Sequence, residues 1–389
     1  MFECNNVDDL TSRLEYIFIM YKQVFFCGSF PKEGEQPYGG GEVGNTRTVS
    51  MLERHGYKVI KIRKRKSPAN RGRLLRLLSY PFRISMDWLT VFCTLIFASR
   101  KSLVHISGFA GKNTFNEYVL MRMTKLLGFS TLYELRGGGA ISFWEKGSFM
   151  YRKMFTSILN NSIYIFIQGK ELIPLIESVS KVSYHYYPNF VEDEFVPKFI
   201  IVKPKDRINL LFYGRLEEEK HVDMVVQIAA IVQKTLPNVY LTIVGNGKKY
   251  YLTMIKECMD KFLAQGTYTF LEGCKHNEIP ELLVDKHFYI FPSTQPLEGQ
   301  SNSVTECMSY GVVPIASPQG FNASTIGNEA LIVEQLSAKA YANRIIDIMK
   351  SGDFDKYSTQ VRKRFLENYT QKVIAEKTLA VYQDIMNIV

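Results

Sequence analysis

Cysteine and histidine are scarce in this chain of 389 residues, which contains six of each. The cysteines are scattered and form no C-x-x-C pair: Cys4, Cys27, Cys93, Cys258, Cys274 and Cys307. This spacing excludes a disulfide framework and argues against a zinc site. We therefore expect reduced cytosolic thiols.

Long hydrophobic runs are also missing. The longest, Trp88 to Ala98, has about half of the roughly 20 residues that span a bilayer. The N-terminal sequence MFECNNVDDL is acidic and leads into no apolar block with a small-residue cleavage site, so we expect no standard secretory signal. The expectation is a cytoplasmic protein that is soluble or attached peripherally to the inner face of the cell membrane.

The composition is that of a globular protein, because 46% of the residues are hydrophobic and 22% are charged. It excludes a disordered chain and a collagen-like fibre. Residues 1–200 contain 27 Lys and Arg against 17 Asp and Glu, whereas residues 201–389 contain 21 of each. The N-terminal half therefore carries the whole net charge of +10, which predicts two domains with different partners.

Strand and helix patterns alternate through both halves of the chain. In the first half a strand at 22–28 and a strand beginning at 57 flank a glycine-rich turn at 38–42 and a helix that ends near residue 55. The other predicted strands lie at 103–106, 130–135, 163–167, 208–213, 239–244, 269–271, 288–291, 313–316 and 331–333. Helices are predicted from about 337 to the end, interrupted at 351–352. This alternation predicts an α/β protein with two doubly wound parallel-sheet domains.

The boundary between these domains is predicted in the irregular, proline-containing stretch after Tyr186. It gives an N-terminal domain at 1–195 and a C-terminal domain from 196. Ligands of such domains bind at the carboxyl ends of the strands, so a cleft between the two domains is the expected site.

The region from Phe291 to Glu306 carries the strongest cluster of polar residues. A strand ends near residue 292, a loop contains Glu298, and a helix is predicted to begin near Asn302 or Ser303, with Ser301 and Ser303 as suitable N-cap residues. The free N–H groups of such a helix suit a phosphate, and Glu306 could accept hydrogen bonds from two ribose hydroxyls. The simpler alternative is one surface glutamate and one glutamate near a helix start.

Two cations, Arg215 and Lys220, follow the predicted strand 208–213. Cations at this position can neutralise a diphosphate leaving group. The alternative is a solvated run of charges, because Glu217, Glu218 and Glu219 lie between them.

Together these motifs resemble the retaining glycosyltransferases of family 4, which have the GT-B fold of two Rossmann-like domains facing across a cleft. The matching motifs are the turn at 39–41 with 56–59, the segment 188–191, Gly214-Arg215 with Lys220, the turn 244–247, the segment 279–283, and Glu298 and Glu306 followed by Gly311.

The resemblance implies roles for the matching residues. Glu306 would hold the donor ribose, Glu298 would lie over the donor sugar, and Arg215 and Lys220 would bind the diphosphate. Loop amides would contact the sugar and phosphates, and the N-domain turn would close on the pyrophosphate: Gly299, Gln300, Ser301, Asn302 and Ser303 for the loop, Gly40 and Gly41 for the turn. The co-substrate would be a UDP- or GDP-linked sugar, with no metal and no further cofactor. The C-terminal domain would be 196–368, with a final helix at about 369–389 joining the N-terminal domain.

The sequence departs from the family pattern at two places. His221 stands where a glycine commonly follows the diphosphate lysine, and Arg136, before three glycines, stands where many relatives carry His or Asp. Arg136 stays protonated and cannot be a general base. It could hold a donor phosphate or an anionic acceptor, or it could be a surface turn residue. We take Glu298 and Arg136 as the candidate catalytic residues. Family members are usually pictured with the leaving diphosphate oxygen taking the acceptor proton.

A basic segment from Lys58 to Arg76 contains nine Lys or Arg and no acidic residue. Its leucines share one helical face flanked by arginines, which is typical of a helix on an anionic membrane. The predicted docking residues are Lys61, Arg63, Lys64, Arg65, Lys66, Arg71, Arg73, Leu74, Arg76, Leu77 and Leu78. The alternative is a solvated loop followed by a core helix. Nucleic-acid binding is less favoured because aliphatic rather than aromatic residues alternate with the basic ones.

The sequence therefore predicts a retaining glycosyltransferase that moves a sugar from a nucleotide diphosphate sugar to a glycan. The expected acceptor is lipid-linked or part of a cell-surface polysaccharide, such as a lipopolysaccharide intermediate. The alternatives are a sugar-nucleotide epimerase or hydrolase of the same fold, and a basic nucleic-acid-binding protein.

Overall fold

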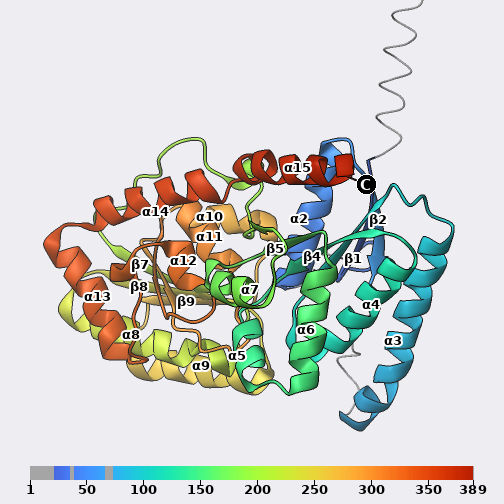
Figure 1. The fold of residues 1–389 in the computed structure, drawn as a ribbon. Coiled ribbons are helices and arrows are strands. Elements are labelled where there is room, and N and C mark those ends of the chain that lie inside the picture. The colour runs from blue at the N-terminus through green and yellow to red at the C-terminus, as the bar shows by residue number, and fades with distance from the viewer. Residues whose placement is uncertain (1–21, 36–38, 66–72, 389) are drawn as a thin grey trace, which may run out of the picture. The chain divides into compact units, whose positions relative to one another are not determined.

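The computed structural model describes residues 22–35, 39–65 and 73–388, which form two compact units (Figure 1). The first unit runs to Gln168 and also contains Leu172–Tyr187 and the end of the chain from Ala375. The second contains Gly169–Glu171 and Pro188–Ile374. The main boundary thus lies between residues 187 and 188, whereas the sequence prediction puts it between 195 and 196.

The first unit is built on a parallel sheet of six strands in the order β2-β1-β3-β4-β5-β6. The strands are β1 Gln23–Gly28, β2 Lys58–Arg63, β3 Leu103–Gly108, β4 Ser130–Leu135, β5 Tyr164–Ile167 and β6 Tyr184–Tyr186. All six residues of β3, next to the middle of the sheet, are buried. Such continuous burial is expected for a parallel strand covered on both faces.

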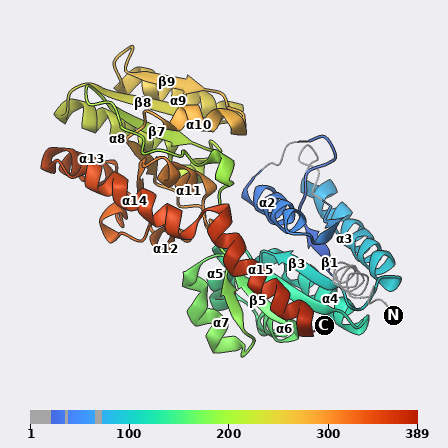
Figure 2. The same ribbon diagram turned by 90° about the horizontal axis from the view of Figure 1, so that it is seen from above.

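Helices follow most of these strands. They are α2 Gly40–Arg54, α3 Arg73–Ile96, α4 Thr114–Leu126, α5 Gly139–Lys146, α6 Phe149–Asn161 and α7 Ile173–Val179. The last helix, α15 Gln371–Ile388, begins in the second unit, and its residues from Ala375 belong to the first (Figure 2). Its Tyr382 is fully buried and packs edge-on against Phe166 of β5.

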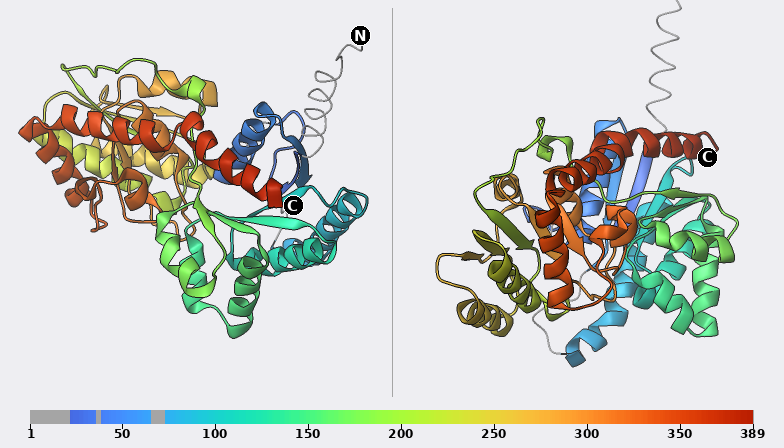
Figure 3. Two further views of the ribbon diagram at one scale, coloured as in Figure 1. Left: turned by 45° about the horizontal axis from the view of Figure 1, so that its top comes forward. Right: turned by 90° about the vertical axis from the view of Figure 1, so that its left-hand side faces the viewer.

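The second unit contains a parallel sheet of five strands in the order β11-β10-β7-β8-β9. The strands are β7 Ile208–Tyr213, β8 Val239–Val244, β9 Tyr268–Leu271, β10 Phe288–Phe291 and β11 Val313–Ala316. The helices are α8 Val222–Thr235, α9 Lys249–Phe262, α10 Ile279–Leu283, α11 Asn302–Ser309, α12 Asn322–Ile326, α13 Ala338–Ser351 and α14 Phe354–Asn368 (Figure 3).

The prediction of a strand at 331–333 is wrong. Glu329–Leu331 forms a short 3₁₀ helix, and Ile332 makes only an isolated bridge to Ala316 of β11. The apolar residues that suggested a strand are buried there without a hydrogen-bonded ladder.

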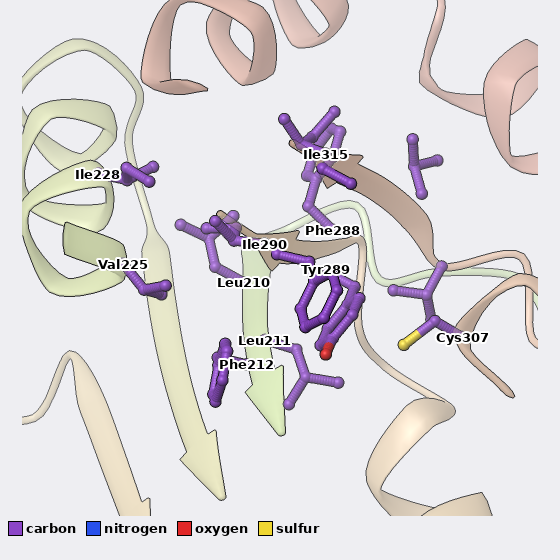
Figure 4. Close-up of a cluster of buried hydrophobic side chains, with 14 of the residues drawn as sticks. Leu210, Leu211, Phe212, Val225, Ile228, Phe288, Tyr289, Ile290, Cys307 and Ile315 are labelled. Carbon is purple, nitrogen blue, oxygen red and sulfur yellow. The ribbon is translucent and has the colours of Figure 1, made fainter. Parts of the chain in front are cut away.

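The core of the second unit lies around its central strands. Leu210 and Leu211 of β7 and Ile290 of β10 are fully buried, and Val225 of α8 packs from one side of the sheet (Figure 4). Cys307 of α11 joins the same core, and burial raises the pKa of its thiol. Replacing one of these side chains by alanine is expected to cost about 2–5 kcal/mol. This packing gives the polar loops at the ends of β7 and β10 a rigid base.

Candidate active site

Lys220 and Glu298, 78 residues apart in the sequence, form an ion pair. Lys220 ends a short 3₁₀ helix after β7, and Glu298 lies in the loop after β10. The Ser293 hydroxyl donates to Glu298 at 2.9 Å, and the Lys220 ammonium lies 4.7 Å from the centre of the Phe291 ring. Lys220 is buried. The fold thus brings together the cation predicted to bind diphosphate and the carboxylate predicted to lie over the sugar.

Arg215, the second predicted cation, has a different environment. Its side chain is 48% exposed and pairs with Glu217, with 2.7 Å between Nη1 and Oε1. Exposed pairs of this kind contribute about 0–1 kcal/mol. Arg215 can therefore change partner at little cost, whereas Lys220 is buried and its partner Glu298 also accepts from Ser293.

His221 occupies a left-handed conformation, with φ 49° and ψ 48°. Glycine adopts this conformation without steric cost, and histidine is among the few other residues that tolerate it. The histidine ring also bonds to Thr294, with 2.7 Å between Nε2 and Oγ1. The departure from the family's glycine therefore leaves the left-handed backbone in place.

The glycines at 245 and 247 allow two loops to approach closely. A Cβ on Gly245 would lie 1.9 Å from the carbonyl oxygen of Gly214, and one on Gly247 would lie 2.1 Å from that of Leu216. The Leu216 amide also donates to Asn246 at 2.9 Å. These glycines thus join the loop after β7, which carries Arg215, to the loop after β8.

Glu306 lies one turn into α11 and is only 4% exposed. Its Oε2 accepts a hydrogen bond of 2.7 Å from the hydroxyl of Tyr213, the last residue of β7. Burial and the nearby Glu306 carboxylate raise the pKa of Tyr213, so the phenol stays protonated. Tyr213 is not among the predicted site residues, although its position directly before the Gly214-Arg215 motif is a usable signal.

The start of α11 is not capped as the sequence predicts. Ser301 occupies the N-cap position, but its side chain makes no capping hydrogen bond. Its hydroxyl lies 2.8 Å from that of Ser303, which lies 2.7 Å from that of Tyr289. The buried Oδ1 of Asn302 has no hydrogen-bond partner among the described residues. The helix start thus presents backbone amides and one unsatisfied acceptor.

Gln300 and Gly299 hold the loop in place through their own contacts. The side-chain amide of Gln300 accepts a hydrogen bond of 2.6 Å from the backbone N–H of Asn189 and donates one of 3.1 Å to the backbone carbonyl of Asn189. The side chain of Asn189 donates a third, of 3.0 Å, to the backbone carbonyl of Gln300. The Gly299 carbonyl accepts from Phe321 at 3.3 Å. The Gln300 side chain is therefore committed to Asn189.

The predicted site residues of the first unit lie at the carboxyl end of its sheet. Gly40 and Gly41 are the first two residues of α2, and Gly40 is exposed. Arg136 directly follows β4 and is buried, so the alternative of a surface turn residue is wrong. Its Nη2 lies 2.6 Å from Oε1 of Glu134. Burial opposes ionisation of Glu134, but Arg136 and His105 together keep the pKa of this carboxyl below its usual value.

The residues predicted to dock on a membrane are only partly covered by the structure. Lys66 and Arg71 lie outside the described residues, as do the side chains of Arg73, Leu74, Arg76 and Leu77. Lys61 is exposed, as is Leu78. Two of the remaining cations have internal partners, because Lys64 donates to the Ser107 carbonyl and Arg65 pairs with Asp87. Arg63 is half-buried.

Two negative findings concern metals and membranes. Within residues 22–35, 39–65 and 73–388, no group of three or more His, Cys, Asp or Glu is placed to hold a metal ion. No helix in this part of the chain combines the length and hydrophobicity needed to cross a bilayer.

Comparison with known proteins relates the second unit to one family. Residues 194–370 match the family model described as Glycosyl transferases group 1. The chain is 24% identical over 226 residues to the poly(glycerol-phosphate) alpha-glucosyltransferase of Bacillus subtilis (strain 168). That alignment covers 57% of this chain and 32% of the relative, so the chain spans about a third of the relative's length.

Solved structures with the same fold cover nearly the whole chain. Sucrose-phosphate synthase from Thermosynechococcus elongatus has a TM-score of 0.73 at 16% identity and covers 95% of this chain and 100% of its own. Anabaena Alr3699/HepE in complex with UDP has a TM-score of 0.66 at 12% identity and covers 93% and 100%. The predicted fold class, an α/β protein with two Rossmann-like domains of the GT-B type, is confirmed.

Proposed function

We propose, from the match of residues 194–370 to the family model of the glycosyl transferases group 1, that the chain is a retaining glycosyltransferase. Its donor is a nucleotide diphosphate sugar, linked to UDP or GDP. Its acceptor is a hydroxyl of a lipid-linked or cell-surface polysaccharide. Two similar proteins support these choices, namely the poly(glycerol-phosphate) alpha-glucosyltransferase for the acceptor and the Anabaena structure in complex with UDP for the donor.

The observation that carries the proposal is the grouping of Lys220, Glu298 and Glu306 in the second unit. Glu306 and Lys220 are buried, and both lie at the carboxyl ends of strands in one sheet. Parallel sheets bind ligands at this edge. In the proposed complex the ribose hydroxyls donate hydrogen bonds to Glu306. The diphosphate replaces Glu298 as the ion-pair partner of Lys220, and the Glu298 carboxylate then contacts the sugar.

This exchange of partners suits transfer with retention of configuration. The bond between the sugar C1 and the diphosphate oxygen breaks, and the acceptor oxygen bonds to C1 on the same face. The departing diphosphate oxygen takes the acceptor proton, so no separate base is needed. Lys220 and Arg215 stabilise the negative charge that develops on the diphosphate, and the buried position of Lys220 strengthens its contribution.

The donor assignment is tested by titrating UDP and GDP by calorimetry into wild type and Glu306→Gln. The ribose hydroxyls lose an ionised acceptor in the variant, so we expect affinity to fall about a hundredfold. Glu334→Gln, at an exposed glutamate of the same unit, is the matched control. Equal affinity in wild type and Glu306→Gln would contradict the assignment.

The epimerase or hydrolase alternative shares the donor site but differs in its need for an acceptor. Incubation of the protein with its nucleotide sugar alone separates the two. Turnover only after an acceptor glycan is added supports transfer, and rapid turnover without one would favour the alternative.

The outer face of α3 supports a membrane-associated acceptor. Its exposed apolar residues recur at every third, fourth or seventh position, which places them on one side of the helix. They are between 38% and 69% exposed: Leu75, Leu78, Phe82, Leu89, Phe92 and Ile96. The opposite side is buried through Ile84, Val91 and Leu95. One apolar side of α3 is thus packed in the protein and a second apolar side is exposed to solvent. An exposed apolar helix face of this kind suits the interface of a bilayer.

The charge around this face favours anionic lipid. Asp87, the one acidic residue of α3, is buried and paired with Arg65. Lys58 and Lys61 are exposed on the edge strand β2, which packs against α3. Each cation near an anionic surface contributes about 1 kcal/mol. We include this surface, with the basic segment before it, as the proposed membrane contact.

Flotation with vesicles of phosphatidylglycerol and phosphatidylcholine tests the membrane contact. Phe82→Asp with Leu89→Asp should reduce binding about tenfold or more, because apolar area is lost and negative charge is added. Phe199→Asp, at an exposed apolar side chain of the second unit, is the control. Unchanged binding of the α3 variant would contradict docking through this helix.

A further inference from the structure

A line of buried polar side chains crosses the first unit from α15 to the end of β4. The Tyr382 hydroxyl lies 2.5 Å from Nδ1 of His105, whose Nε2 lies 3.0 Å from Oε2 of Glu134. The other carboxylate oxygen of Glu134 pairs with Arg136 at 2.6 Å. All four residues are at most 3% exposed.

The proton positions in this line follow from chemistry. An ionised carboxylate only accepts hydrogen bonds, so Nε2 of His105 must carry the hydrogen that points to Glu134. Burial lowers the pKa of His105, so the ring is neutral and its Nδ1 accepts from the Tyr382 hydroxyl. Each link then has one donor and one acceptor, running from Tyr382 to Glu134, with Arg136 donating from the other end.

The far end of the line rests against α2. Nη1 of Arg136 lies so close to Gly44 that a Cβ there would be 1.9 Å away. Gly44 is one turn after Gly40, and its carbonyl accepts from Thr48 at 2.9 Å. The Thr48 hydroxyl in turn lies 2.8 Å from that of Tyr187. The first turns of α2 thus contact Arg136 at Gly44, and the Thr48 hydroxyl links them to Tyr187.

We propose that Arg136 is a positioning residue, and that Tyr382, His105 and Glu134 act through it to hold the glycine turn at the start of α2. The proposal rests on the proposed function, because it takes that turn to contact the donor pyrophosphate, as the family resemblance implies. Arg136 is buried and its charge is paired with Glu134, so it holds the turn against Gly44 and does not itself bind phosphate. The C-terminal helix therefore supports a binding element formed more than 300 residues earlier in the sequence.

The arrangement itself is tested by nitrogen NMR of the histidine rings in the full chain. In wild type at neutral pH we expect His105 to be protonated at Nε2 and unprotonated at Nδ1. Tyr382→Phe should shift the Nδ1 resonance, and Tyr369→Phe, which removes another buried hydroxyl, should not. The opposite tautomer or a charged ring would overturn the proposal.

The positioning role is tested by a double-mutant cycle read by hydrogen exchange of the α2 amides. Gly44→Ala forces Arg136 aside, so we expect exchange in the first turns of α2 to rise about tenfold. Arg136→Lys keeps the positive charge but removes the guanidinium group that contacts Gly44. In that background, Gly44→Ala should raise the exchange rate little further. Tyr382→Phe should follow the same pattern with a smaller effect. If the two substitutions raise the exchange rate independently, so that the double variant shows the product of the single effects, the proposal is overturned.

Nucleotide binding separates this proposal from the function on which it rests. If wild type binds UDP or GDP, affinity should fall about tenfold in Gly44→Ala and fall no further when Arg136→Lys is added. Full affinity in Gly44→Ala would overturn the positioning role and leave the donor assignment intact. If wild type binds neither nucleotide, the donor assignment fails, and hydrogen exchange still decides whether the line holds α2.

Discussion

The two units each contain an ion pair near the end of a sheet, but the pairs are built differently. Glu134 and Arg136 are almost completely buried, and Glu134 has a second partner in His105. Glu298, by contrast, lies in a loop with its side chain 13% exposed, and its other partner is the hydroxyl of Ser293. The first pair resembles a structural support, whereas the second has room to exchange a carboxylate for a phosphate. Burial and the number of partners therefore distinguish a charge with a structural role from a charge that can bind a ligand.

Removing one cation from each pair should give the largest difference between them. Arg136→Ala leaves Glu134 buried beside a neutral histidine, so we expect the free energy of unfolding to fall by about 3–5 kcal/mol. Lys220→Ala should cost less, about 1–2 kcal/mol, because Glu298 is partly exposed and keeps the hydrogen bond from Ser293. Urea unfolding of both variants checks this, and equal losses would remove the distinction between the pairs.

Acidification should weaken the second unit through a buried histidine that resembles His105. Burial lowers the pKa of His287 to about 4, and its Nδ1 accepts from the Asn209 amide at 3.1 Å. Because the unfolded chain binds this proton near pH 6.5 and the folded chain does not, stability is lost as the pH falls below that value.

Between pH 7 and pH 5 we expect the free energy of unfolding to fall by roughly 2 kcal/mol on account of this group. His287→Gln should lose about that much of the pH dependence in urea unfolding. An unchanged pH profile in the variant would show that His287 titrates normally.

Neutralising Glu298 should free its lysine for the ligand. In Glu298→Gln the Lys220 charge is no longer balanced, so we expect UDP to bind about tenfold more tightly while sugar transfer slows. Glu217→Gln is a matched control, because Glu217 pairs with the exposed Arg215 and should alter UDP affinity less than about twofold. Weaker UDP binding in Glu298→Gln would contradict the exchange of partners.

The smallest effect is expected for His221→Gly, at a position where the backbone conformation can be separated from the side chain. His221→Gly removes the left-handed strain and also the bond to Thr294, so stability should change by less than about 1 kcal/mol. His221→Val places a β-branched residue in the same conformation and should cost about 2 kcal/mol. Thermal unfolding that ranks the two variants equally would contradict the conformational explanation.

Local patterns were sufficient to predict the alternation of strands and helices and the loop that carries Glu298. Apolar runs bounded by turn residues depend on neighbours in the sequence, and a parallel sheet explains why those runs are continuous. The glycines at 245 and 247 were also visible, but the physical need for them, the approach of the backbone at 214–216, depends on a neighbouring strand.

The polar contacts that complete the site were harder to predict. Tyr382 and His105 are 277 residues apart, and no spacing rule links them. Ser301 has the residue type of an N-cap, yet its hydroxyl bonds to Ser303 because Tyr289 offers a hydroxyl to that pair. Such choices depend on which partners the tertiary structure supplies, and the capping preference is overridden.

The path of α15 bears on how this protein can be divided. A fragment that ends at Tyr187 contains all six strands of the first sheet but lacks the tyrosine that packs between Phe166 and His105. Its sheet would present an uncovered apolar surface and an unpaired histidine nitrogen. A synthetic peptide of 371–388 supplied with that fragment would restore both, so the first unit is suited to reconstitution from two separate pieces.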